Sequence, residues 1–109
     1  MKITALLCLL LFCGCFCYTQ NKKIDSLNHL IAEATSDTQR INLEVEMIHQ
    51  LSYTNLDSSI ALGNKTIREA QAKNYKKGEA GARIRLAGSC CFKGDYTTAK
   101  QQLDICLAI

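Results

Sequence analysis

The sequence predicts an all-α fold. Proline and tryptophan are absent from the 109 residues, and alanine, leucine, isoleucine, lysine, glutamate and glutamine fill much of the chain after residue 20. That mixture favours helices. Apolar residues also recur at helical spacing in five successive segments, which short polar breaks separate. Since roughly 90 residues remain after the first twenty, we expect one small helical domain and no second domain.

Residues 1–19 have the features of a secretion signal peptide. Lys2 supplies one positive charge, an apolar run follows it, and a polar stretch begins at Gln20. The run is too short to cross a bilayer as a stable helix, for which about 20 apolar residues are needed. We therefore expect an exported protein of the periplasm or cell envelope, with residues 20–109 as its folded domain.

Cys15 offers a second way of processing the signal. The glycine before it is similar to part of a bacterial lipobox, in which a lipid is attached to the cysteine after cleavage, whereas Phe12 and Cys13 depart from that pattern. Lipidation at Cys15 would be the chain's one link to a membrane. The alternative is simple cleavage between Cys15 and Gln20.

The seven cysteines do not predict a disulfide framework. Four of them lie in or beside the signal peptide, so that only Cys90, Cys91 and Cys106 remain in the folded part. Free cysteine packs as a small apolar residue, and we expect Cys90 and Cys106 to fill the core. A bridge from Cys106 to Cys90 or Cys91 is the alternative, because the envelope is oxidising.

The helical segments divide into one extra helix and two hairpins. The extra helix is expected over residues 21–35, the first hairpin over 37–73 and the second over 75–109, where the apolar end at Ile109 suggests truncation or the N-terminal piece of a longer protein. Helix-capping residues mark the breaks. They are a Ser36-x-x-Gln39 capping box, Asn55, Gly94 as a left-handed cap, and Asp95.

The two hairpins repeat at a fixed spacing. Ser59 and Ala99 occupy equivalent places 40 residues apart, a spacing typical of repeat arrays. The second unit resembles a tetratricopeptide repeat (TPR), most closely in Gly94-Asp95-Tyr96 followed by Ala99. Residues at the motif's packing positions are Leu86, Ala87, Cys90, Gly94, Tyr96, Ala99, Leu103 and Cys106.

Packing explains this alternation of sizes. Small residues at Ala87, Ala99 and Cys106 would allow two helices to approach closely, while Leu86, Tyr96 and Leu103 are expected to fill the space between hairpins. Ala87 stands where the motif favours glycine, and Cys90 stands where it favours tyrosine. An exposed end face around Leu103 and Leu107 is expected to be covered by further repeats, by self-association or by a partner.

Residues 21–109 as a whole resemble exported TPR proteins of the Bacteroidetes type. The resemblance implies a short right-handed α-solenoid that acts as a protein-protein interaction scaffold and holds a peptide or partner domain in its concave groove. In many such proteins the repeats are the periplasmic input region of a histidine kinase or transcription regulator, so a sensory fragment is the alternative. The residues expected to line the groove are Asn42, Glu46, His49, Arg83 and Ser89.

No pattern for catalysis, a cofactor or a metal is present in the sequence. It contains no His-Glu-x-x-His, no Gly-x-Ser-x-Gly, no phosphate-binding loop and no dinucleotide fingerprint. The formal charge of +3 includes Lys2 and is too small to predict nucleic-acid binding. Glu44 and Glu46 fall on different helix faces and are expected to be ordinary solvated residues. We therefore expect a binding protein and not an enzyme.

Overall fold

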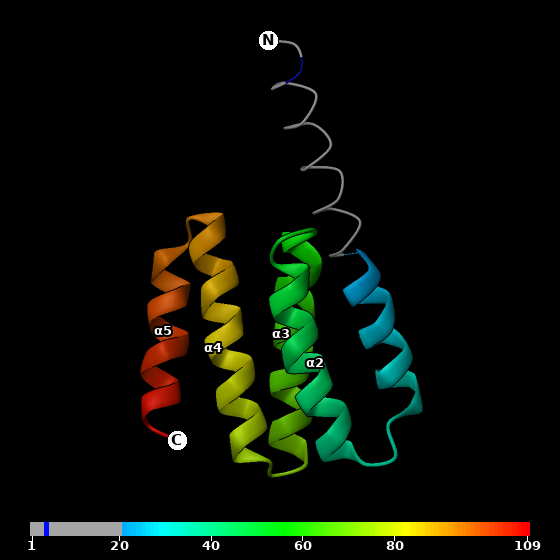
Figure 1. Ribbon diagram of the computed structural model, residues 1–109. Helices are drawn as coiled ribbons and strands as arrows, with labels where there is room; N and C mark the ends of the chain where they lie inside the picture. Colours follow the sequence, from blue (N-terminus) through cyan, green and yellow to red (C-terminus); the bar gives the residue numbers. More distant parts are fainter. Residues whose placement is uncertain (1–3, 5–20) are drawn as a thin grey trace.

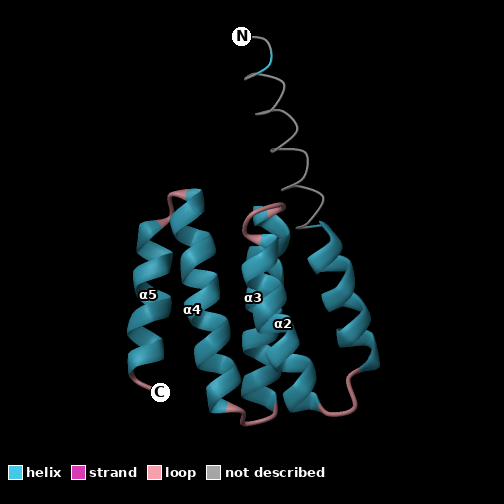
Figure 2. Cartoon of the chain, viewed as in Figure 1, coloured by secondary structure: helices cyan, strands magenta, loops and turns pink. Residues whose placement is uncertain are grey.

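The computed structural model describes residues 4 and 21–109, and within residues 21–109 it contains helices and no strand (Figures 1 and 2). The first described helix spans residues 21–33. It is followed by α2 (Asp37–Leu51), α3 (Leu56–Ala72), α4 (Lys76–Lys93) and α5 (Tyr96–Leu107). The prediction of an all-α fold is confirmed for these residues. The predicted signal peptide, with Cys15, lies outside the described residues apart from Thr4.

The capping box before α2 forms with one change of partner. Ser36 Oγ accepts a hydrogen bond from the backbone N–H of Gln39 at 3.1 Å, as expected. The side chain of Gln39 reaches back to the N–H of Thr35 at 3.2 Å, one residue before the N-cap. Both ends of the box therefore satisfy backbone donors, which fixes where the chain leaves the preceding loop and enters α2.

The turns between the remaining helices follow local capping chemistry. Asn55 and Asp95 accept hydrogen bonds from the third residue of α3 and α5, each at 3.1 Å, and so act as the expected N-caps. Gly94 ends α4 in the left-handed conformation, with φ of 86°. Asn74 takes the same region after α3, with φ of 54°. Since these turns are short, α2 to α5 run antiparallel in succession (Figure 1).

The core lies where α2, α3, α4 and α5 meet. Helix α4 is central, because it contacts each of the other three. At Gly63 a Cβ atom would lie 3.1 Å from Leu86 Cδ1, so glycine allows α3 to approach α4 closely. At Gly78 a Cβ would lie 2.7 Å from Ile41 Cγ2, which brings α4 close to α2. The buried cluster comprises Ile48, Ile67, Ala82, Leu86, Ala87, Cys90 and Ala99.

A buried polar contact joins three helices within this core. Ser59 Oγ donates to the carbonyl oxygen of Ile48 at 2.7 Å and lies 2.7 Å from Ser89 Oγ. Ser59 is fully buried and Ser89 is 1% exposed. The hydroxyls satisfy one another, so that α2, α3 and α4 are aligned without leaving a buried polar atom unpaired at this point.

Two of the expected packing residues lie on an open surface. Leu86, Ala87, Cys90 and Ala99 are buried, whereas Tyr96 is 69% exposed and Leu103 is 43% exposed. No described helix lies beyond the outer side of α5, so Tyr96 and Leu103 are uncovered in the described residues, and their packing between hairpins stays a prediction. Gly94, which was placed in the same set, acts through its backbone conformation.

The cysteines of the folded part are free thiols, so the disulfide alternative is not seen. Cys90 is buried, and that burial raises the pKa of its thiol. Cys106 is half-buried, and its Sγ donates to the carbonyl oxygen of Ala80 at 3.7 Å. Cys91 is exposed. Core filling is therefore confirmed for Cys90, and Cys106 packs at the edge of the α4–α5 contact.

Candidate functional site

A groove lies between the C-terminal half of α2 and the C-terminal half of α4. Its cavity volume is about 270 Å³. One wall comes from the end of α2 and the turn after it, and the other comes from one face of α4. We call this the α2–α4 groove, and its residues are His49, Ser52, Tyr53, Ile84, Arg85, Gly88, Ser89 and Phe92.

The α2–α4 groove exposes three large apolar side chains. Tyr53 and Ile84 are each 51% exposed, and Phe92 is 62% exposed. The ring centroids of Tyr53 and Phe92 are 6.1 Å apart, and those of His49 and Tyr53 are 5.1 Å apart in an edge-on arrangement. Solvent-exposed apolar side chains gathered around a hollow are typical of an interaction site.

Gly88 leaves part of the groove open. It lies inside α4, where glycine is about 1 kcal/mol less favourable than alanine. A Cβ atom at Gly88 would have no heavy atom within 4 Å, in contrast to the close approaches at Gly63 and Gly78. Packing within the chain therefore does not require glycine here. What glycine provides at this position is open space between Ile84 and Phe92, one helical turn away on either side.

Arg85 gives the groove a positive group. Its guanidinium is 3.9 Å from Glu46 Oε2, at the outer limit of an ion pair, and its side chain is 38% exposed. On the other wall, His49 Nε2 lies 3.5 Å from the hydroxyl of Tyr53. A guanidinium has five donors, and so long a single contact leaves Arg85 able to hydrogen-bond a carboxylate.

Only two of the five residues expected to line a groove lie in the α2–α4 groove. His49 and Ser89 line the α2–α4 groove, although the Ser89 hydroxyl is turned into the core contact with Ser59. Glu46 is exposed and pairs at long range with Arg85. Asn42 is exposed too, and its Oδ1 accepts a hydrogen bond from the hydroxyl of Tyr75 at 2.8 Å, away from this groove.

Arg83 is not a groove residue. It is 8% exposed, and it donates to Glu79 Oε2 at 3.1 Å and to Gln102 Oε1 at 2.6 Å. The expectation was wrong because the helical period alone does not say which neighbour a face meets. This face of α4 meets α5, where Arg83 ties the two helices together.

Six groove residues were missed from the sequence. They are Ser52, Tyr53, Ile84, Arg85, Gly88 and Phe92. A signal for three of them exists, since Ile84, Gly88 and Phe92 are spaced by four residues and form a stripe separate from that of Ala82, Leu86 and Cys90. Tyr53 follows α2 in a turn, and its place beside Phe92 depends on tertiary packing.

Two larger crevices flank the helix of residues 21–33. Their volumes are about 450 and 410 Å³, and α2 contributes to both. Their apolar walls are aliphatic, and Ile24, Leu27 and Ile31 of the N-terminal helix are already half-buried there. We regard these crevices as the seams of a loosely packed helix, and the α2–α4 groove with its exposed aromatic rings as the better candidate site.

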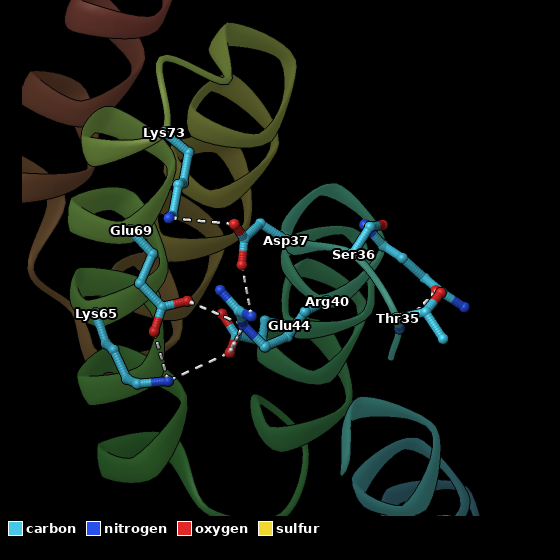
Figure 3. A network of polar contacts seen from close by, with 9 residues as sticks. Thr35, Ser36, Asp37, Arg40, Glu44, Lys65, Glu69 and Lys73 are labelled. Carbon is cyan, nitrogen blue, oxygen red and sulfur yellow. Dashed lines mark hydrogen bonds and ion pairs between the residues drawn. The ribbon is translucent and has the colours of Figure 1, made fainter. Parts of the chain in front are cut away.

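Glu44 differs most clearly from its predicted position on the solvated surface. It was expected to be solvated, yet it is 2% exposed and lies in a polar network between α2 and α3 (Figure 3). Its Oε1 is 3.2 Å from Lys65 Nζ, and its Oε2 accepts a hydrogen bond from Thr66 Oγ1 at 3.2 Å. Partners on α3 therefore compensate for the burial of a carboxylate on α2.

The described residues contain neither a metal-ligand cluster nor a membrane-spanning helix. In the part of the chain that the structure describes, no three His, Cys, Asp or Glu side chains are grouped as metal ligands. Within the same part, none of the helices combines the length and apolar character needed to cross a membrane. In comparisons with known proteins, the chain matches no protein-family model, no curated protein and no solved structure.

Proposed function

We propose that this chain is an exported, TPR-like interaction scaffold that binds a peptide, or an extended segment of a partner domain, in the α2–α4 groove. The observation that carries the proposal is the set of exposed apolar side chains around Gly88. A stacked TPR arrangement is part of the same proposal. It is supported by the contacts of α4 with both α2 and α3 and by the 40-residue spacing of the two hairpins.

The size of the groove favours a peptide side chain over a small-molecule cofactor. Pockets for drug-sized ligands have volumes of about 300–1,000 Å³, and the α2–α4 groove, at about 270 Å³, falls below that range. One aromatic or aliphatic side chain would fill the space over Gly88, between Ile84 and Phe92. An acidic group next to it in the peptide would reach Arg85. We expect the ligand to combine these two features.

A selection from a random phage-displayed peptide library on the full chain tests this proposal. Selected peptides are expected to contain an aromatic or large aliphatic residue close to Asp or Glu, and to bind with a Kd in about the micromolar range. The acidic requirement is checked by replacing that Asp or Glu with its amide, which is expected to weaken binding. Peptides with no such pattern, or with no dependence on the carboxylate, would contradict the proposed recognition.

The alternative function is the periplasmic sensory part of a two-component histidine kinase or transcription regulator. One observation favours it, since Leu103 and Leu107 on α5 are 43% and 87% exposed, as expected for a face that another hairpin covers. Reading the genomic frame past the codon for Ile109 decides between the two. Further repeats, a membrane helix and an output domain would support the sensor, whereas a stop codon would support the self-contained scaffold.

A further inference from the structure

Two glutamates share the same cationic partners in the joint between α2 and α3 (Figure 3). Lys65 Nζ is 3.2 Å from Glu44 Oε1 and 2.8 Å from Glu69 Oε1. Arg40 Nε lies 3.9 Å from Glu44 Oε1 and 3.8 Å from Glu69 Oε2. One lysine and one arginine therefore contact both carboxyl groups, and these groups belong to one small cluster between α2 and α3 (Figure 3).

In the described part of the chain, one carboxylate oxygen of this pair has no hydrogen-bond donor. Glu44 Oε2 is satisfied by Thr66. Glu69 Oε2 is buried and accepts no hydrogen bond from any side chain or backbone group of the described residues. A buried carboxylate such as Glu44 and a neighbouring carboxylate repel each other if both are ionised. A proton on one of them would remove that repulsion and would supply the missing donor.

We propose that Glu44 and Glu69 form a proton-binding site in which the folded chain holds one shared proton, and that release of this proton weakens the contact between α2 and α3. Glu44, the more deeply buried of the two, carries the proton and donates it to the Glu69 carboxylate. Glu69 stays ionised and keeps its short ion pair with Lys65. The proton is exchanged with solvent, and no other reactant is needed.

Arg40, which contacts both glutamates, is also held by a third carboxylate. From α2, Asp37 is 2.8 Å from Arg40, and from α3, Lys73 is 3.2 Å from Asp37. These contacts draw Arg40 toward Asp37. The N-terminal helix faces Glu44 with the uncharged residues Ile24, Asn28 and Ile31. On α4, the buried charged residues are Glu79 and Arg83, which pair with each other at 3.1 Å.

The two carboxyl groups titrate in opposite directions. Burial, followed by the hydrogen bond with Glu69, raises the pKa of Glu44. Burial also opposes ionisation of Glu69, but hydrogen bonds from Lys65 and Glu44 outweigh it and lower the pKa of Glu69. The stability linked to Glu44 is thus lost as pH rises through its raised pKa, and that linked to Glu69 is lost as pH falls through its lowered pKa. Stability is expected to be greatest between the two values.

Urea unfolding of the full chain at a series of pH values from about 4 to about 7.5, below the usual pKa of cysteine thiols, tests the shared proton. In the wild type, the urea midpoint is expected to fall on the alkaline side, with a slope of up to about one proton taken up per chain on folding. Glu44→Gln keeps a hydrogen-bond donor beside Glu69 but cannot titrate. It is expected to abolish the alkaline fall and to unfold at higher urea than the wild type at the alkaline end.

Glu46→Gln is the matched control, since Glu46 lies two residues further along α2 and is exposed. It removes the same formal charge and is expected to keep the pH dependence of the wild type. A Glu44→Gln chain that keeps the alkaline fall would overturn the proposal. If Glu44→Gln fails to fold, infrared spectra of the wild type decide, because a carboxylic-acid band that persists above the usual glutamate pKa supports the shared proton, and its absence there overturns it.

The unfolding experiment is independent of the proposed function, since it detects the shared proton whether or not any peptide binds. If the unfolding experiment detects the shared proton but the peptide selection fails, the proton-site proposal is supported and only the groove proposal is contradicted.

Discussion

Replacing Gly88 with leucine is expected to weaken peptide binding by at least about tenfold, which corresponds to a loss of about 1.4 kcal/mol. The new side chain would occupy the open space over Gly88, where no heavy atom lies within 4 Å of the position that a Cβ atom would take. The same substitution is expected to raise the free energy of unfolding by up to about 1 kcal/mol, because leucine is a better helix former than glycine.

Titration calorimetry with a library-selected peptide gives the affinity, and urea unfolding gives the stability. Ala61→Leu is the matched control, because Ala61 is an exposed position of α3 outside the α2–α4 groove. It adds a leucine to a helix surface and is expected to leave the affinity unchanged. Unaltered binding by Gly88→Leu would show that the peptide does not use the groove. Because the substitution is expected to stabilise the fold, unfolding cannot explain a loss of affinity.

Replacing Leu86 with alanine is expected to lower the free energy of unfolding by about 2–5 kcal/mol. Leu86 is 1% exposed and belongs to the cluster that joins α2, α3, α4 and α5. Its Cδ1 packs against Gly63, so the removed side chain would leave a cavity that the rigid helix contact cannot readily close. Since small domains have about 5–15 kcal/mol of total stability, this loss is a large fraction.

A lower urea midpoint with an unchanged m-value would establish that loss. Ile84→Ala serves as the comparison, because Ile84 lies two residues earlier on α4 and is 51% exposed. Its effect on the free energy of unfolding is expected to stay within about 1 kcal/mol, while its loss from the α2–α4 groove is expected to weaken peptide binding. Equal destabilisation by the two substitutions would refute the assignment of core and groove faces on α4.

Helix positions were predictable from the sequence because the signals that set them act over a few residues. Ser36, Asn55 and Asp95 each accept a hydrogen bond from a backbone group three residues on, and Gly94 ends α4 by its own conformation. The residues of the central core could be predicted for the same reason. Buried residues such as Ile48 and Leu86 recur at helical spacing, and the apolar faces of neighbouring helices have to meet.

The candidate site was only partly predictable, because it depends on which helix each face meets. Arg83 and Glu44 have ordinary surface residue types, and only the positions of α5 and α3 explain why both are buried. Tyr96 was expected to fill the space between hairpins from its place in a motif, but in the described residues it is exposed on the outer side of α5. His49 and Ser89 were predicted as groove residues and do line the α2–α4 groove, while Ile84, Gly88 and Phe92 on α4 become visible as groove residues only from the packing of α4 against α2.

The most direct test of the central claim is to measure intermolecular nuclear Overhauser effects between a library-selected peptide and the full chain. Contacts from the peptide's apolar side chain to Tyr53, Ile84 and Phe92 are the predicted result, since these three side chains surround the open space at Gly88. Contacts confined to Leu103 and Leu107 on α5 would contradict the account and would make the outer face of α5 the binding surface.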